Sequence, residues 1–197
     1  MIKAHGRYKY QYSNGVYDTT AVRKNADVLS YRVEASLHGK HKNEDTWNLK
    51  YYHYNSERGL PGAIVANRFH RPQRLWDRNH FLQADYQHKF SERYRVKLRA
   101  KYANDFSKYL DPEIVTTTGF LNNRYKQQEY YLSLVHSFKL KPFWTLSLAT
   151  DYQHNAMQAN LYRFAYPKRN TLLNALVSDF EFERLNIQAS LDRKSVV

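Results

Sequence analysis

The sequence has no cysteine, few glycines and prolines, and no long apolar run. Without cysteine, the 197 residues can form neither a disulfide framework nor a thiolate metal site, and the redox compartment stays open. No apolar run reaches about 18 residues, which excludes a transmembrane helix. The first dozen residues include no apolar segment of the secretory type, so we expect no signal peptide within this chain.

Aromatic side chains and positive charge are abundant instead. The 18 Tyr, 10 Phe and 3 Trp make up 16% of the residues, although the mean hydropathy is -0.81. Large rings on a polar background are typical of strands with one apolar face. The formal net charge is +13, which favours nucleic acid as a partner when the cations are clustered. Here they are spread along the chain and no nucleic-acid-binding motif occurs, so a basic all-β nucleic-acid binder is the least favoured alternative.

The stretch from Phe81 to Ala103 has the clearest pattern, with apolar and polar residues alternating on both sides of a turn at Ser91-Glu92-Arg93. Period two is the signature of a strand, so the stretch predicts a β-hairpin with one apolar and one polar face. The apolar positions are Leu82, Ala84, Tyr86, Phe90, Tyr94, Val96, Leu98, Ala100 and Tyr102. The opposing positions are Gln83, Asp85, Gln87, Lys89, Arg95, Lys97, Arg99 and Lys101.

Similar alternation predicts about nine antiparallel strands in all. Apart from the central hairpin, the predicted strands cover about 7–13, 28–38, 45–55, 126–138, 144–153, 171–182 and 185–191. The connections alternate between long (15–26, 56–78, 105–125, 156–170) and short (39–44, 91–93, 139–143, 183–184). In an up-and-down meander every second connection lies at the same end, so the long ones share one rim. Short turns at one end and long loops at the other are typical of outer-membrane barrels.

Alternation alone does not say whether the apolar face lines a soluble barrel or faces lipid. Full charges on the opposing face, such as Asp85 and Arg99, favour a watery lumen, and rings near strand ends favour interfacial girdles. We therefore predict an all-β fold, an antiparallel up-and-down meander of about nine strands that is part of a transmembrane β-barrel. Residues 1–197 are expected to form a single partial barrel domain in the bacterial outer membrane.

Two features predict that the sequence is a fragment. Nine is an odd number, whereas single-chain bacterial barrels close with an even number of strands. The last residues, Leu191 to Val197, lack the terminal aromatic residue of a complete barrel. An even strand count and a terminal aromatic residue would have favoured the alternative, a small outer-membrane channel or barrel enzyme.

Four segments resemble the barrel of TonB-dependent outer-membrane receptors, in particular the vitamin B12 or siderophore receptors of Bacteroides-like bacteria. They are SERGLPGA at 56–63, QRLWD at 73–77, KYLDPE at 108–113 and NNRYKQQEYY at 122–131. The resemblance implies a barrel of about 22 strands closed by a plug domain. It also implies active uptake of a large ligand such as cobalamin or a siderophore, with outer-membrane lipid and the TonB complex as partners. The plug and TonB box, through which TonB acts, are not recognised in this chain.

Candidate ligand-binding residues lie in the long connections. A turn at Gly59-Leu60-Pro61-Gly62 would project basic and aromatic side chains towards an anionic or aromatic ligand, and a second set of rings would provide a stacking surface at the same rim. The candidates are Arg58, Arg68, His70, Arg71, Arg74, Trp76, Tyr109, Tyr162 and Tyr166. The alternatives are a loop that only folds over the barrel mouth, and an aromatic girdle.

No catalytic pattern is found. The nine histidines show no HExxH spacing, and neither a GxSxG motif nor a phosphate-binding glycine loop occurs. We therefore expect neither enzymatic activity, nor a metal, nor a cofactor.

Overall fold

The computed structural model describes residues 1–13, 15–41, 45–63, 71–117 and 119–196. The described residues form strands and no helix long and apolar enough to cross a membrane. The strands are β1 (Ile2–Ala4), β2 (Lys9–Ser13), β3 (Asp18–Val22), β4 (Val28–Lys40), β5 (Thr46–Leu60), β6 (Gln73–Ser91), β7 (Tyr94–Thr116), β8 (Gly119–Lys141), β9 (Trp144–Ala159), β10 (Lys168–Glu181) and β11 (Asn186–Val196).

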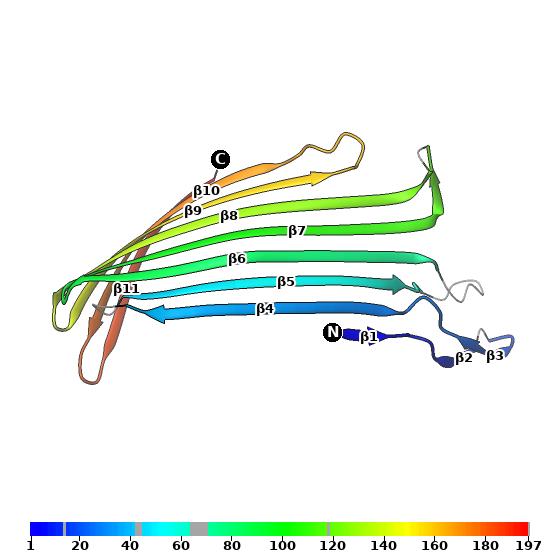
Figure 1. Cartoon of the computed structure of the whole chain (residues 1–197), viewed down its shortest axis with the longest axis horizontal. Coiled ribbons are helices and arrows are strands. Elements are labelled where there is room, and N and C mark those ends of the chain that lie inside the picture. Colours follow the sequence, from blue (N-terminus) through cyan, green and yellow to red (C-terminus); the bar gives the residue numbers. More distant parts are fainter. Residues whose placement is uncertain (14, 42–44, 64–70, 118, 197) are drawn as a thin grey trace.

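Nine strands form one curved antiparallel sheet in the order β1-β4-β5-β6-β7-β8-β9-β10-β11 (Figure 1). From β4 onwards each strand pairs with the next one in sequence, so the predicted antiparallel meander is confirmed. The edge strands β1 and β11 do not pair with each other, and within the described residues the sheet is therefore open. β1 is short and pairs only with the first residues of β4, with Ala4 opposite Val28 and Ile2 opposite Ser30.

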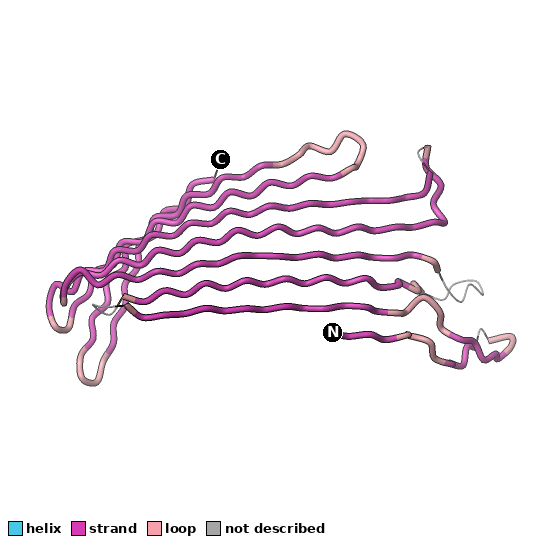
Figure 2. The backbone as a smooth tube through the Cα atoms, viewed as in Figure 1, coloured by secondary structure: helices cyan, strands magenta, loops and turns pink. Residues whose placement is uncertain are grey.

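The two ends of the sheet differ in their connections (Figure 2). At one end, the short-turn rim, two-residue turns join β6 to β7 at Glu92-Arg93 and β8 to β9 at Pro142-Phe143. At the other end, the long-loop rim, lie the β2–β3 hairpin and the connections 61–72 and 160–167. The connections 61–72 and 160–167 agree with the predicted long-loop end, but β7 and β8 are joined at this same end by a two-residue link, so the predicted division is only partly confirmed.

The N-terminal strand prediction was wrong in detail. Residues 7–13 were expected in the main sheet and 15–26 as a polar connection, yet β2 pairs only with β3 in a separate two-stranded sheet. Tyr10 and Tyr12 stand opposite Ala21 and Thr19 in that hairpin. The alternation of β2 was recognised correctly, but alternation does not identify the partner strand.

The boundaries of the long connections were also wrong. The predicted loop 105–125 continues the ladder of β7 and β8, in which Lys108 stands opposite Arg124. Within the predicted loop 56–78, β5 runs to Leu60 and β6 starts at Gln73. In these extensions both faces include polar and charged residues, so the alternation that signals a strand ends while backbone pairing continues.

The sheet is one layer thick, and its two faces differ. On the apolar face one ladder runs from Tyr51 through Leu82 and Tyr102 to Tyr130. Beside it on the same face, a second row of register partners runs from Tyr86 through Leu98 to Leu134. Across the sheet these side chains stay exposed, for example Leu82 at 45%, Leu132 at 48% and Leu176 at 43%.

Only Ala103 and Ala159 are buried apolar residues in the part of the chain described. A domain usually buries such a face against a second layer. The described residues provide no such layer.

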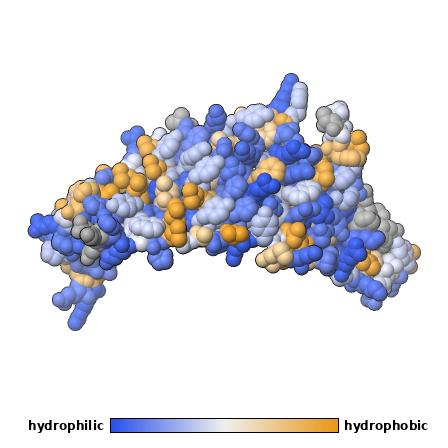
Figure 3. Space-filling view, in the orientation of Figure 1, coloured by the Kyte–Doolittle hydropathy of each residue, from blue (hydrophilic) through white to orange (hydrophobic). Residues whose placement is uncertain are grey.

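The polar face lies on the other side of the same strands. Its ladder includes Lys50, Gln83, Lys101 and Tyr131, in register with one another. In the view of Figure 3 the surface is mostly hydrophilic, with separate apolar patches among the hydrophilic residues. The alternation predicted for 81–103 therefore corresponds to two chemically distinct faces.

Candidate functional site at the long-loop rim

Arg74, near the start of β6, binds two carboxylates. Its Nη2 lies 2.9 Å from Asp27 Oδ2 and 2.7 Å from Glu57 Oε1. Its Nε donates a further hydrogen bond of 3.1 Å to Glu57. The hydrogen bond from Arg74 holds the pKa of Asp27 below its ordinary value. Arg74 is therefore charge-compensated and is not available for an anionic ligand.

Asn25 ties the segment before β4 to the start of β6. Its Nδ2 donates to the backbone carbonyls of Arg71 at 2.6 Å and Gln73 at 2.7 Å. Asn25 has φ 55°, a left-handed conformation that asparagine tolerates better than most residues. Gly59 lies against the same segment, where a Cβ would come within 2.4 Å of the Asn25 carbonyl oxygen. Close approach, rather than a turn, explains this glycine.

Trp76 on β6 is covered by two cations. Lys108 Nζ lies 4.5 Å from the ring centroid, and Arg74 Cζ lies 5.9 Å from it. Both distances are within the range of cation–π attraction. In strand register Trp76 stands opposite Glu57 and Lys108, on the apolar-face side of the sheet.

Arg58 extends from the polar-face side of β5. Its Nη2 lies 2.9 Å from Asp77 Oδ2, and the Ser107 hydroxyl donates to the other carboxylate oxygen at 2.9 Å. Ser56, directly opposite Asp77, is 1% exposed. Because Asp77 already compensates its charge, Arg58 forms part of a structural ion pair.

Asp111, on the polar-face side, accepts hydrogen bonds from a second group of donors. Gln73 Nε2 donates to Asp111 Oδ2 at 2.7 Å, and the Tyr109 hydroxyl donates to the same oxygen at 3.3 Å. Asp111 is 3% exposed. The carboxylate of Asp111 thus orients Tyr109 on the polar face of the sheet.

The connection 160–167 presents two tyrosines. Tyr162 is 87% exposed, and Arg163 Cζ lies 5.2 Å from its ring. Tyr166 is 55% exposed and meets Phe164 edge-on at 5.4 Å. Since β7 and β8 separate β6 from this connection, these rings do not join the Arg74 group.

The sequence-predicted site is therefore divided. Arg74 and Trp76 lie on the apolar-face side, Arg58 and Tyr109 on the polar-face side, and Tyr162 and Tyr166 in a separate loop. Arg71 is held through its backbone carbonyl, while Arg68 and His70 lie outside the described residues. Sequence reasoning missed the carboxylates Asp27, Glu57, Asp77 and Asp111, because they meet their partners only through strand register.

The basic residues of β7 on the polar face are partly paired. Arg99 Nε lies 3.3 Å from Asp85 Oδ1 on the neighbouring strand. Lys101 Nζ lies 3.0 Å from Glu129 Oε1. Glu34 lies near Arg32 and Lys50 instead. Compensated charges of this kind are typical of a solvated wall.

At the short-turn rim, Asp45 is the centre of a cluster that the sequence did not suggest. His88 Nδ1 lies 2.8 and 2.7 Å from its two carboxylate oxygens, and the Tyr86 hydroxyl donates to it at 3.1 Å. The hydrogen bond from His88 lowers the pKa of Asp45. The cluster links the start of β5 to β6 and so stabilises this end of the sheet.

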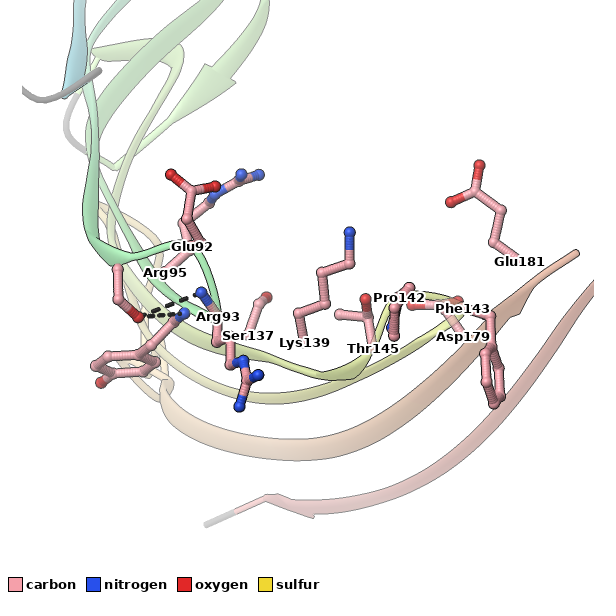
Figure 4. A pocket seen from close by; sticks show the side chains of 12 residues that line it. Glu92, Arg93, Arg95, Ser137, Lys139, Pro142, Phe143, Thr145, Asp179 and Glu181 are labelled. Atoms are coloured by element: carbon pink, nitrogen blue, oxygen red, sulfur yellow. Dashed lines mark hydrogen bonds between the residues drawn. The ribbon is translucent and has the colours of Figure 1, made fainter.

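A hollow of about 230 Å³ lies on the polar face near the same rim (Figure 4). Charged side chains of both signs line it: Glu92, Arg93, Arg95, Lys139, Asp179 and Glu181. The Ser91 hydroxyl accepts hydrogen bonds from the backbone N–H groups of Arg93 and Tyr94 at 3.2 and 3.1 Å, and these bonds fix the β6–β7 turn. The mixed charge does not favour a ligand of one sign.

In the described segments no group of three or more histidine, aspartate or glutamate side chains is placed to hold a metal ion. No protein-family model matches the chain, and no curated protein is found to be similar to it.

Proposed function

We propose that this sheet is part of the wall of a transmembrane β-barrel in the bacterial outer membrane, with the apolar face towards lipid. One observation supports the proposal most strongly: large apolar side chains form a continuous exposed face across the sheet. Leu82, Leu132 and Leu176 retain 43–48% exposure on it. Exposed apolar patches of this extent mark contact with membrane or protein.

The opposite face is suited to a watery lumen. Ion pairs such as Arg99–Asp85 and Lys101–Glu129 are stable next to water. In a membrane barrel lipid-facing and lumen-facing residues alternate along each strand. The alternation of apolar and polar residues along β6 and β7 supports this arrangement. Further strands would pair with the open edges β1 and β11, since barrels close without edges.

We further propose that the complete barrel is a TonB-dependent receptor for a large nutrient such as cobalamin or a siderophore. This role rests on the resemblance of four segments, and the chain itself has no catalytic part in it. Tyr109 on the polar face and Tyr162 and Tyr166 at the rim remain the candidate ligand contacts, whereas its ion pair with Asp77 gives Arg58 a structural role. Arg74 and Trp76 lie on the opposite side, so we assign them a structural role.

The membrane proposal is tested with brominated lipids, which quench tryptophan fluorescence on contact. The three native tryptophans are replaced by phenylalanine, and a single tryptophan is introduced as Leu132→Trp on the apolar face or Ala149→Trp on the polar face. We expect strong quenching at position 132 and weak quenching at 149 in vesicles. Equal quenching at both positions, or no association with vesicles, would contradict the proposal.

The receptor role has its own test. The detergent-folded chain is titrated with cyanocobalamin and with a ferric siderophore, alongside a Tyr162→Ala/Tyr166→Ala variant. We expect weak binding of one ligand that the double variant loses. A folded chain that binds neither ligand would contradict the receptor role, whereas the quenching result would still decide the membrane role.

A further inference from the structure

Four basic residues lie together on the apolar-face side of the long-loop rim. Arg78 stands opposite Phe106, which stands opposite Lys126. One row further out, Lys108 stands opposite Arg124. We call Arg78, Lys108, Arg124 and Lys126 the cationic row.

The cationic row lacks the compensation that Arg74 has. Among the described residues no carboxylate forms an ion pair with any of its four members, and Arg78, Arg124 and Lys126 are exposed. Within the described residues, the ammonium group of Lys108 contacts the ring of Trp76. Like charges placed directly opposite, as Lys108 and Arg124 are, destabilise a strand pair. An anion shared between them would relieve this repulsion.

The position of the cationic row relative to the apolar band restricts the kind of anion. Lys126 is four residues from Tyr130 and Arg78 is four residues from Leu82, on the same face in each strand. Four residues span about 13 Å along a strand, or about 10 Å along the membrane normal at the usual barrel tilt. This distance places the cations at headgroup depth when the apolar band lies in the hydrocarbon core.

We infer that the cationic row binds the phosphate groups of anionic lipid in the leaflet at the long-loop side. The inference rests on the proposed membrane role. A lipid fits both parts of this surface, because its acyl chains lie over the apolar band while its phosphate meets the row. Each Lys or Arg near an anionic membrane surface contributes about 1 kcal/mol of attraction, which corresponds to about a 5-fold preference.

Trp76, which touches Lys108, is a built-in reporter for the test. The chain with Trp47→Phe and Trp144→Phe is folded into neutral phosphatidylcholine vesicles. These vesicles contain a small fraction of phosphatidylglycerol or phosphatidylcholine brominated near the headgroup. We expect brominated phosphatidylglycerol to quench Trp76 with at least about 5-fold higher apparent affinity than the neutral lipid, and added salt to reduce this preference.

Two charge-matched variants locate the effect. Arg78→Gln/Lys126→Gln should reduce the preference by at least about 5-fold, while Arg95→Gln/Lys97→Gln, which removes the same charge from the polar face of β7, should retain it. Equal quenching by both lipids in the parent chain would overturn the inference and leave the membrane role intact. Loss of the preference in both variants would also overturn it, since net charge would then explain the effect. Absence of quenching by either lipid would contradict the membrane role, and this inference with it.

Discussion

Leu98 and Arg99 are neighbours on β7, yet they belong to different environments. Leu98 stands between Tyr86 and Leu134 on the apolar face and is 39% exposed, and no other layer among the described residues covers it. Arg99 stands between Asp85 and Ser133 and is held by a carboxylate at 3.3 Å. The charges of the polar face are partly paired within the sheet, whereas the apolar side chains are left exposed by the described residues. The comparison shows that the two faces of the sheet differ in chemistry, as the membrane proposal requires.

The largest expected effect comes from placing a charge on the apolar face. Leu98→Arg should destabilise the membrane-inserted protein by about 2–4 kcal/mol, the cost of Arg near the bilayer midplane. Ala149→Arg is the matched change on the polar face and should cost no more than about 1 kcal/mol. Urea unfolding from vesicles measures both. Similar costs for the two variants would remove the distinction between the faces.

A smaller loss of stability is expected at Asn25, whose side chain ties the segment before β4 to the start of β6. Asn25→Ala loses the two bonds to the carbonyls of Arg71 and Gln73 and strains a left-handed backbone, which should cost about 2 kcal/mol. Asn25→Gly loses the same bonds without the strain, so about half of that cost is expected. Hydrogen exchange of the amides at 71–73 is the local readout. If the Gly variant were as destabilised as the Ala variant, backbone strain would not contribute.

Arg74 and Arg78 lie on the same side of β6 and allow a cation held by carboxylates to be compared with one that has no ion pair among the described residues. Arg74→Gln leaves Asp27 and Glu57 without their shared counterion and should cost about 1 kcal/mol. Arg78→Gln should change the free energy of unfolding by less than about 0.5 kcal/mol. Urea unfolding of both variants decides the point, and a larger loss for Arg78→Gln would contradict the assignment.

The smallest expected effect is a pH dependence at the rim. Because the folded pKa of Asp27 is lowered, its contribution to stability is fully present above the unfolded value of about 3.9. It is lost as the pH falls from there through the folded pKa. Asp27→Asn should flatten this part of the curve of unfolding free energy against pH. Above pH 5 the difference in unfolding free energy between the variant and the parent should stay constant with pH. An unchanged acid limb in the variant would show that other carboxylates dominate it.

The sequence predicted the faces of β6 and β7 because apolar and polar residues alternate from Leu82 to Phe90, with His88 as the one exception, and from Tyr94 to Tyr102. It did not predict the extensions of these strands, because beyond Ala103 polar residues occupy both faces while pairing continues.

The partners of Arg74 were also beyond sequence reasoning. Asp27 lies 47 positions away and Glu57 lies 17 positions away, and only the register of β4, β5 and β6 brings the three together. Alternation is a local property, whereas ion pairing across strands depends on register.

The central claim is that β7 alternates between lipid and water, and the cysteine-free sequence makes it directly testable. Single cysteines introduced from Arg95 to Tyr102 and spin-labelled in vesicles report access to oxygen, which concentrates in lipid, and to a water-soluble nickel chelate. We predict high oxygen access at the even positions and high nickel access at the odd positions, in opposite phase. In-phase profiles, or nickel access at every position, would contradict the account.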